Sequence, residues 1–281
     1  MMTNNNCYLP HEAEIVERVI ESPSIFTMRL RFVDDTTHNA YEFIPGQFNM
    51  VYLPGGGEVA ISIVSDPESK DLYDHTIRIV GRVTKGLAQL KDGDRIGLRG
   101  PFGRGWPMEK AKKHNVIVIT GGIGCAPTVS VIHYILNRRQ DYGRLSILQG
   151  VKHTDDFFYR HRFETWRQAE NTQVFLAANE LGDHYENWHH GFVTDLLDQV
   201  DVDSEHTIAM MCGPEIMMLK SIEKLLQLGM SAENVYLTME RSMHCAVGHC
   251  GHCQFGGKFI CKDGPVFSFP EVEALLKAKG V

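Results

Sequence analysis

The chain has 281 residues with 43% hydrophobic and 22% charged side chains, which predicts a folded protein of roughly two domains. Its 28 basic and 35 acidic residues give a net charge of −7, which offers no general attraction to nucleic acid. The longest strongly apolar run, at 116–119, is far shorter than the ~20 residues of a membrane-spanning helix. The polar start lacks a secretory signal, so we expect no transmembrane segment, no nucleic-acid partner and a cytoplasmic location.

Short apolar runs separated by turns fill the first hundred or so residues. The turns include Pro45-Gly46 and the glycines at 55–57. Such a succession is typical of an antiparallel structure, so we predict a β-barrel domain over residues 1–106. Its expected strands lie at 26–32, 47–52, 59–64, 76–83 and 95–98.

Strands alternate with helices in the next part of the chain. Residues 115–120 are typical of a buried parallel strand, and a glycine turn and an amphipathic helix follow. This order predicts a doubly wound parallel sheet, an α/β domain, over residues 107–239. The last segment, 240–281, is too short for its own core and is expected to wrap around a metal centre. Further strands are expected at 145–150, 173–177, 207–211 and 235–239, and helices at 157–169, 193–199 and 215–228.

Two loops of the predicted α/β domain have the features of a nucleotide site. The glycine-rich turn at 120–128 lets backbone N–H groups approach a phosphate at a helix N-terminus. Its spacing is not the G-x-G-x-x-G fingerprint, and such a turn alone is as often structural. Cys212-Gly213-Pro214 also ends a strand and begins a helix, although Cys212 alone would more often be a small buried residue. Together the loops predict a crevice at the carboxyl edge of the sheet.

Four cysteines near the end of the chain are spaced Cys245-x4-Cys250-x2-Cys253-x7-Cys261. The first three have the spacing of plant-type [2Fe–2S] ferredoxins, whereas the fourth lies unusually close. Zinc is the alternative, but structural zinc usually uses paired C-x2-C knuckles, and only one such pair is present. We therefore predict that these thiolates hold an iron–sulfur cluster. The nearby histidines are expected to flank it as polar residues: His244, His249 and His252.

These features together resemble the ferredoxin–NADP reductase superfamily, in the branch with a C-terminal iron–sulfur cluster. That branch includes gamma subunits of soluble nickel–iron hydrogenases (sulfhydrogenases), B subunits of anaerobic sulfite reductases, and electron-transfer subunits of dihydroorotate dehydrogenases. The stretches 250–254 and 261–267 are most similar to the hydrogenase gamma subunits. The segments that carry the resemblance are 43–48, 61–63, Gly103, 121–127, 212–218 and 240–267.

The resemblance implies FAD in the barrel, NAD or NADP in the α/β domain, and a 2Fe–2S cluster on the four cysteines. It places Ser62, Cys212 and Glu240 where nicotinamide meets flavin, as the catalytic set. The implied cofactor contacts of the barrel are Pro45, Gly46, Gln47, Ile61, Ser62, Ile63, Gly81, Val83, Thr84 and Gly86. Those of the α/β domain are Gly121, Gly122, Gly124, Ala126, Pro127, Cys212, Gly213, Pro214 and Met217.

Two departures from the family pattern affect the cofactors. Val59 stands where many members have an arginine for the FAD phosphate, and Ile61 replaces the usual tyrosine. Ala178-Asn179, followed by Glu180, replaces the Ser-Arg pair for the 2′-phosphate of NADP, which favours NAD without excluding NADP. The cations that could compensate are Lys85 or Arg78 for FAD, and Lys152 or Arg160 for NADP.

The resemblance implies an electron-transfer subunit that connects NAD(P)H, FAD and the cluster with a catalytic partner, by preference a nickel–iron hydrogenase. The paired C-x-x-C ligands of a nickel–iron site are absent from the sequence, so the terminal chemistry is expected in that partner. Dihydroorotate dehydrogenase and anaerobic sulfite reductase are the alternative partners. From other classes, a zinc-stapled non-catalytic binding protein and a redox sensor remain open.

Overall fold

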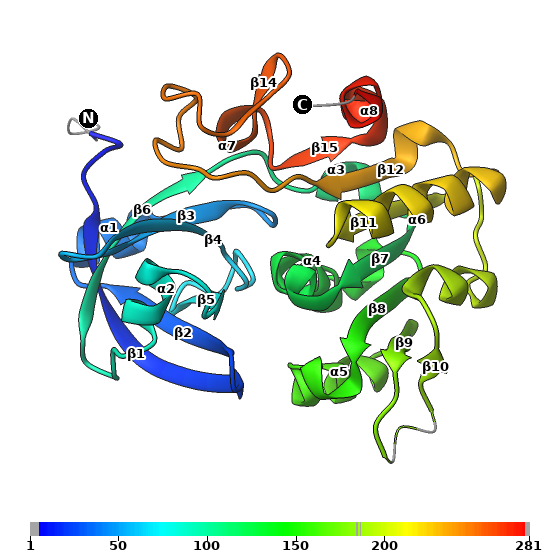
Figure 1. Cartoon of the computed structure of the whole chain (residues 1–281), viewed down its shortest axis with the longest axis horizontal. Coiled ribbons are helices and arrows are strands. Elements are labelled where there is room, and N and C mark those ends of the chain that lie inside the picture. Colours follow the sequence, from blue (N-terminus) through cyan, green and yellow to red (C-terminus); the bar gives the residue numbers. More distant parts are fainter. Residues whose placement is uncertain (1–5, 184, 186, 279–281) are drawn as a thin grey trace. The chain divides into compact units, whose positions relative to one another are not determined.

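The computed structural model describes residues 6–183, 185 and 187–278 and divides into two compact units (Figure 1). The barrel unit comprises Met1–Gly105 and Glu240–Pro265, and the α/β unit comprises Trp106–Met239 and Val266–Val281. The segment 240–281 is thus shared between the units instead of forming a body of its own. No helix in the described part of the chain is long and apolar enough to cross a membrane.

The barrel unit is built on an antiparallel sheet in the order β4-β3-β6-β1-β2-β5. Just after β4, the Val64 N–H donates to the carbonyl of Asp74 in β5 at 2.9 Å, which brings the two edges of the sheet together. The barrel expected from the sequence is therefore confirmed. Its strands are β1 (His11–Ser22), β2 (Ile25–Phe32), β3 (Phe48–Leu53), β4 (Gly57–Ser62), β5 (Tyr73–Arg78) and β6 (Arg95–Phe102).

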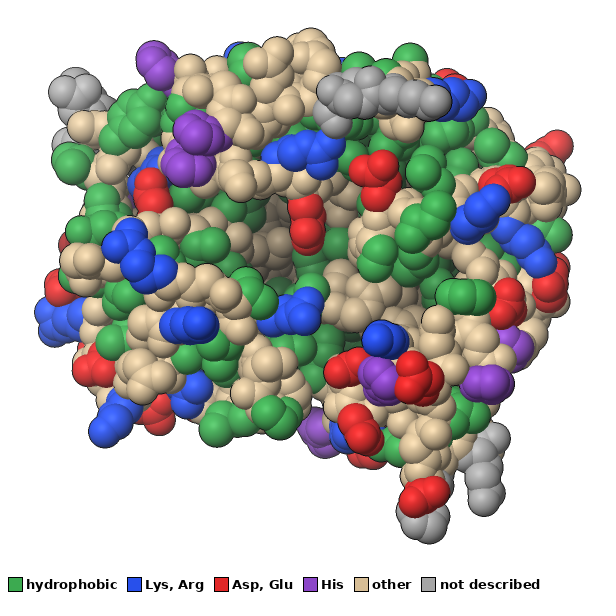
Figure 2. Space-filling model, viewed as in Figure 1, with side chains coloured by type: hydrophobic (Ala, Val, Ile, Leu, Met, Phe, Trp, Pro, Cys, Tyr) green, Lys and Arg blue, Asp and Glu red, His purple; other side chains and the backbone are tan. Residues whose placement is uncertain are grey.

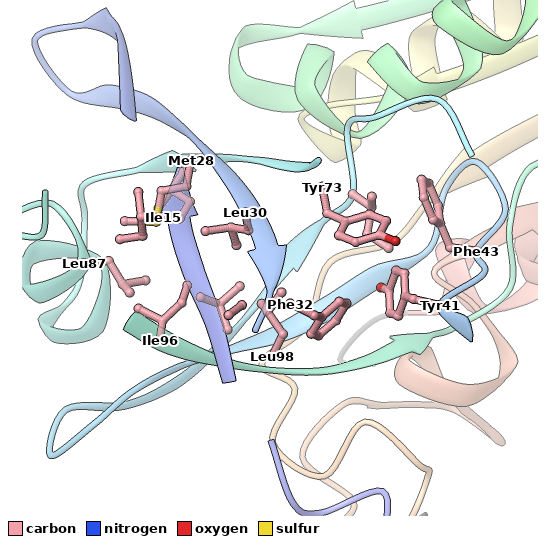
Figure 3. Close-up of a cluster of buried hydrophobic side chains, with 14 of the residues drawn as sticks. Ile15, Met28, Leu30, Phe32, Tyr41, Phe43, Tyr73, Leu87, Ile96 and Leu98 are labelled. Atoms are coloured by element: carbon pink, nitrogen blue, oxygen red, sulfur yellow. The ribbon is translucent and has the colours of Figure 1, made fainter. Parts of the chain in front are cut away.

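Alternation of side chains explains the core of this unit. In β2 every second residue, from Phe26 to Phe32, is buried, while Arg29 and Arg31 point to the other face. Figure 3 shows Met28, Leu30 and Phe32 of β2 packed against residues from β1, β5 and β6. Two short helices complete the unit's first part, α1 (Asp35–Ala40) and α2 (Arg82–Leu87). Helix α2 occupies the end of the strand that we predicted at 76–83.

The α/β unit has a sheet in the order β10-β9-β8-β7-β11-β12-β15, and only its last pair is antiparallel. The doubly wound parallel sheet is thereby confirmed. The antiparallel edge strand β15, which comes from the end of the chain, was not predicted. The strands are β7 (Asn115–Gly121), β8 (Leu145–His153), β9 (Thr172–Glu180), β10 (His189–His190), β11 (Thr207–Cys212), β12 (Val235–Thr238) and β15 (Val266–Ser268).

Amphipathic helices connect these strands. In α6 the residues Met218, Ile222 and Leu225 are buried at helical spacing, while Lys220 and Glu223 form an exposed ion pair. Residues 193–199, predicted as a helix, form a 3-10 helix. The α-helices are α3 (Met108–Ala111), α4 (Ala126–Asn137), α5 (Arg160–Arg167), α6 (Glu215–Gln227) and α8 (Phe269–Lys277). The 3-10 helices are η1 (Gly122–Cys125), η2 (Arg139–Asp141), η3 (Thr154–Asp156), η4 (Val193–Gln199) and η5 (Ala232–Asn234).

The cysteine-rich segment of the barrel unit, orange in Figure 1, has little regular structure. It contains a hairpin of β13 (Gln254–Phe255) and β14 (Lys258–Phe259), followed by α7 (Ile260–Asp263). On the face shown in Figure 2, acidic and basic side chains are interspersed.

Candidate cofactor and cluster sites

The four clustered cysteines lie within one short stretch of the barrel unit. Cys245, Cys253 and Cys261 are buried, whereas Cys250 is exposed. Their thiols are arranged in two hydrogen-bonded pairs, Cys245 with Cys250 and Cys253 with Cys261. Within the described residues, no three Cys, His, Asp or Glu side chains form a group that could hold one metal ion. The thiols are nevertheless close enough to affect one another, since Cys261 is influenced by both Cys253 and Cys245.

Backbone N–H groups point at three of the sulfur atoms. The N–H groups of His249 and Cys250 donate to Cys245 Sγ at 3.2 and 3.4 Å. The Gly248 N–H donates to Cys261 Sγ at 3.2 Å, and the Cys261 N–H donates to Cys253 Sγ at 3.4 Å. Such donors stabilise negative charge on sulfur, which is the form that binds metal.

The environment affects two of these thiols in opposite directions. Burial alone would raise the pKa of Cys245, but the backbone N–H groups of Val247, Cys250 and His249 bring that pKa down to about 6. Burial raises the pKa of Cys261 to about 12, helped by its hydrogen bond to Cys253. The segment thus already favours the thiolate of its first cysteine.

The three neighbouring histidines are exposed and lie outside the pairs of thiols. The rings of His244 and His252 stack at 3.9 Å with an interplanar angle of 17°. Figure 2 shows histidine side chains at the surface over this segment.

The two predicted nucleotide loops meet in the α/β unit. Strands β7 and β11 are parallel neighbours, with Thr120 in register with Cys212. A Cβ on Gly124 would lie 2.4 Å from the carbonyl oxygen of Cys212, and one on Gly121 would lie 2.6 Å from Met217 Sδ. Both positions require glycine because the loops approach so closely.

Buried polar groups hold the first loop in place. The Nε2 amide of Gln149 in β8 donates to the carbonyl of Gly122 at 3.1 Å, and the Thr120 hydroxyl donates to the other end of the same side chain. Thr128 caps the carbonyl of Cys125 at 2.8 Å. Burial raises the pKa of Cys125 above its ordinary value, and the neighbouring Cys212 adds to this effect. The Cys125 thiol is therefore protonated, and Cys212 is buried beside the loop.

Comparison with known proteins identifies both regions. The family described as oxidoreductase NAD-binding domain matches residues 118–223, and the iron–sulfur cluster binding domain of dihydroorotate dehydrogenase B matches residues 240–273. The chain is 36% identical to sulfhydrogenase 2 subunit gamma of Pyrococcus furiosus, over 94% of this chain and 96% of that protein. It is 31% identical to a probable dihydroorotate dehydrogenase B electron transfer subunit of Thermoplasma volcanium, over 92% and 89%.

The chain belongs to this family of electron-transfer subunits. The sulfhydrogenase 1 subunit gamma of P. furiosus is also similar, at 32% identity over 97% of this chain and 95% of that protein. The fold agrees with a solved NADH-dependent reduced ferredoxin-NADP oxidoreductase structure, with a TM-score of 0.71 and 22% identity over 95% of this chain and 93% of that chain. A ferredoxin NADP+ reductase from Neisseria gonorrhoeae gives a TM-score of 0.68 at 18% identity, over 80% and 96%. The protein is thus an oxidoreductase subunit with the ferredoxin reductase fold.

In this electron-transfer subunit the predicted flavin contacts lie along β4 and the turn before β3. Residues of β4 are half-buried throughout, and Ile61 packs against the barrel core. Ser62 of β4 is in register with Phe48 of the neighbouring strand β3. The Gln47 side chain bridges the Ile44 N–H at 2.9 Å and the Gly103 carbonyl at 2.8 Å. Gln47 therefore shapes the turn that contains Pro45 and Gly46, and its main-chain carbonyl accepts from the N–H of Ile63.

The second predicted FAD region is the start of α2. The buried Thr84 hydroxyl accepts from the N–H of Gly81 at 2.9 Å and so fixes the first turn of the helix. The side chain of Arg82 is exposed beside it, and its Nη2 lies 3.8 Å from the position of a Cβ on Gly57. The resemblance implied that residues 81–84 lie near the FAD pyrophosphate, whereas Lys85 and Arg78 were named as replacements for the missing phosphate arginine. The structure adds that Arg82 is the first residue of a short helix and is exposed beside Gly57.

A series of buried polar side chains connects β3 and β5 by hydrogen bonds. The Tyr41 hydroxyl donates to Asn49 Oδ1 at 2.6 Å, so the Asn49 amide donates to His75 Nε2 at 3.1 Å. The Nδ1 of His75 then donates to the carbonyl of Asp74 at 2.7 Å. Burial lowers the pKa of His75 to about 4, which keeps the ring neutral. Nothing in the sequence pattern distinguished this histidine.

The positions that the sequence analysis associated with the choice between NAD and NADP lie at the carboxyl end of β9. The carboxylate of Glu180 is 3.0 Å from His153 Nδ1, and the carbonyl of Asn179 accepts from His190 at 3.0 Å. Arg160 donates to Tyr185, and its side chain is exposed. Glu240, the remaining residue of the predicted catalytic set, is exposed in the barrel unit, whereas Cys212 belongs to the α/β unit.

Proposed function

We propose that this chain carries electrons between NADH and a catalytic partner subunit, with FAD on the barrel and a 2Fe–2S cluster on Cys245, Cys250, Cys253 and Cys261. The observation that supports the proposal most directly is the match of residues 240–273, which contain all four cysteines, to the iron–sulfur cluster binding domain of dihydroorotate dehydrogenase B. Backbone N–H groups that donate to three of the sulfur atoms support it further, because such donors stabilise thiolates that hold a cluster. The family match and the cysteine spacing therefore favour iron over zinc.

The barrel residues fit a flavin in two places. The half-buried strand β4 offers a surface for an aromatic ring system on the face that carries Ser62, while Val59 and Ile61 on its other face anchor the strand to the barrel core. The exposed guanidinium of Arg82 at the start of α2 offers a partner for phosphate, in place of the arginine that the sequence lacks at Val59. When bound, FAD exchanges electron pairs with nicotinamide and single electrons with an iron–sulfur cluster.

The α/β unit fits a dinucleotide. Gly121, Gly124 and Gly213 keep the loops after β7 and β11 free of side chains, so that a pyrophosphate can approach the backbone at the start of α4. The carboxylate of Glu180 would repel a 2′-phosphate and accept hydrogen bonds from ribose hydroxyls. We therefore expect NADH to be preferred over NADPH.

For the partner, we favour a nickel–iron hydrogenase. The gamma subunits of two sulfhydrogenases match this chain over almost its full length at 32% and 36% identity. Dihydroorotate dehydrogenase is the second candidate, because the family match over residues 240–273 is to its iron–sulfur domain. Purification of the tagged chain from its own cells distinguishes them: hydrogen-dependent reduction of NAD supports the first, and dihydroorotate-dependent reduction supports the second.

The decisive experiment is an anaerobic visible spectrum of the purified chain with iron, sulfide and zinc analysis. Flavin bands over broad iron–sulfur absorption, with two irons per chain and bleaching by NADH at lower concentration than NADPH, are expected. A colourless protein containing zinc would refute the proposal and support the non-catalytic binding protein.

A further inference from the structure

One buried arginine of the barrel unit connects the barrel to the cysteine segment. Arg99 in β6 is 4% exposed and uses all five of its N–H donors. Two go to the carboxylate of Glu58 in β4, at 2.8 and 2.6 Å. Two go to the carbonyls of Cys245 at 2.9 Å and His244 at 2.7 Å, and the fifth goes to the carbonyl of Cys7 at 3.2 Å.

The strands place this arginine on the outer face of the barrel. Leu98 and its partner Val51 in β3 belong to the core, so Arg99 and its partner Met50 point to the opposite face. Glu58 reaches the guanidinium from the next strand, β4, across β3. Because side chains alternate, Glu58 and Ser62 lie on the same face of β4. The segment with the first cluster ligand is thus attached to the face that carries Ser62.

The charges of this contact balance. Glu58 is 30% exposed and binds the guanidinium with both oxygens, so the pair adds no net charge beside Cys245. An unpaired charge would act strongly in this buried place, because the medium screens it little. Removal of either partner therefore leaves a charge of known sign next to the first ligand.

We infer that Arg99 and Glu58 are positioning residues that fix the His244–Cys245 turn on the flavin-binding strand and hold the reduction potential of the cluster by mutual charge compensation. This inference rests on the proposed function. Reduction adds negative charge to a cluster, so a neighbouring positive charge favours it and a negative charge opposes it. The position of the turn depends on the five donors, whereas the potential depends on the net charge.

Four variants separate these two effects in the full-length, cluster-loaded protein. Glu58→Gln leaves the guanidinium uncompensated, and the cluster potential is expected to become more positive. Arg99→Gln leaves the carboxylate uncompensated, and the potential is expected to become more negative. Arg99→Lys keeps the charge with only three donors, so the potential is expected to stay near that of the wild type. Arg95→Gln is the control, because Arg95 lies on the same strand as Arg99 but forms an exposed ion pair with Glu12 of β1.

Potentials are measured by reductive titration followed by EPR, and the position of the turn is measured by hydrogen exchange of the amides at 248–250. Both Arg99 variants are expected to speed that exchange at least tenfold, and Glu58→Gln is expected to change it less. If Arg99→Gln does not retain its cluster, the charge effect is tested by Glu58→Gln alone, through the direction in which its cluster potential shifts.

Three results would overturn the inference. One is a shift of the potential in the same direction for Glu58→Gln and Arg99→Gln, another is no shift of the potential in Glu58→Gln, and the third is unchanged amide exchange in both Arg99 variants. A wild-type protein without an iron–sulfur EPR signal would instead refute the proposed function itself, and the inference with it.

Discussion

The neutral His75 at the end of the buried polar chain makes the stability of the barrel unit depend on pH. In the folded protein its pKa is about 4, whereas an unfolded histidine has a value of 6.5. The unfolded chain therefore binds a proton that the folded chain excludes at any pH between these two values. Stability is highest above pH 6.5, falls as the pH decreases through this range, and levels off below about pH 4.

The size of the effect follows from the gap of ~2.5 between the two pKa values. At ~1.36 kcal/mol for each unit, the total loss is about 3 kcal/mol. About 2 kcal/mol of it is expected between pH 7.5 and pH 5. This is a large part of the stability of an ordinary domain.

The assay is native-state hydrogen exchange of the β5 amides in low concentrations of urea, which reports opening of the barrel unit. The variant His75→Gln keeps an acceptor for Asn49 but cannot titrate. Since all other groups titrate in both proteins, the stability advantage of the wild type over this variant should shrink by about 2 kcal/mol between pH 7.5 and pH 5. A difference that stays constant over this range would refute the argument from burial.

The remaining predictions concern the cofactor sites. Gly124→Ala should weaken NADH binding about tenfold or more in a fluorescence titration, because the new methyl group meets the backbone of β11. Gly122→Ala meets no atom within 4 Å and costs only the strain of its left-handed backbone, with φ at +55°, so it should weaken binding less. Cys250→Ser should lose most of its iron–sulfur absorption and iron, whereas Cys7→Ser, outside the cluster segment, should keep both. Arg82→Gln should weaken FAD binding about tenfold in ultrafiltration assays with the flavin-free protein, an effect that added salt reduces; equal retention of FAD would contradict its role.

Much of the fold follows from local pattern. The buried strand at 115–120 and the glycine turn after it were predicted because a parallel central strand is apolar on both faces. Strand β1 was missed because only Ala13 and Ile15 among its twelve residues are fully buried, and its many charges hide the alternation. The end of the strand predicted at 76–83 became a helix because Thr84 caps the turn at Gly81.

The site residues likewise divide into those that a local sequence pattern predicts and those that only the folded structure brings together. The cysteine spacing predicted the cluster segment because ligands close in sequence must be close in space. Arg99, by contrast, bonds to Glu58, 41 residues away, and to Cys245, 146 residues away, and no local pattern announces such pairs. Residues 81–84 were expected near the FAD pyrophosphate from the resemblance, but the proximity of Arg82 to Gly57 could not be predicted because it depends on how β4 and α2 pack.

The path of the chain has a consequence for how this protein can be divided or inherited. The chain leaves the barrel unit after Gly105, returns at Glu240 and leaves again after Pro265 to supply β15 to the other sheet. A truncation after Gly105 would separate the four clustered cysteines from the barrel strands. A truncation after Met239 would remove β15, which pairs with β12. Neither unit is one continuous stretch of sequence. A gene fusion or an exchange of domains therefore has to transfer the whole chain or reconnect more than one crossing between the units.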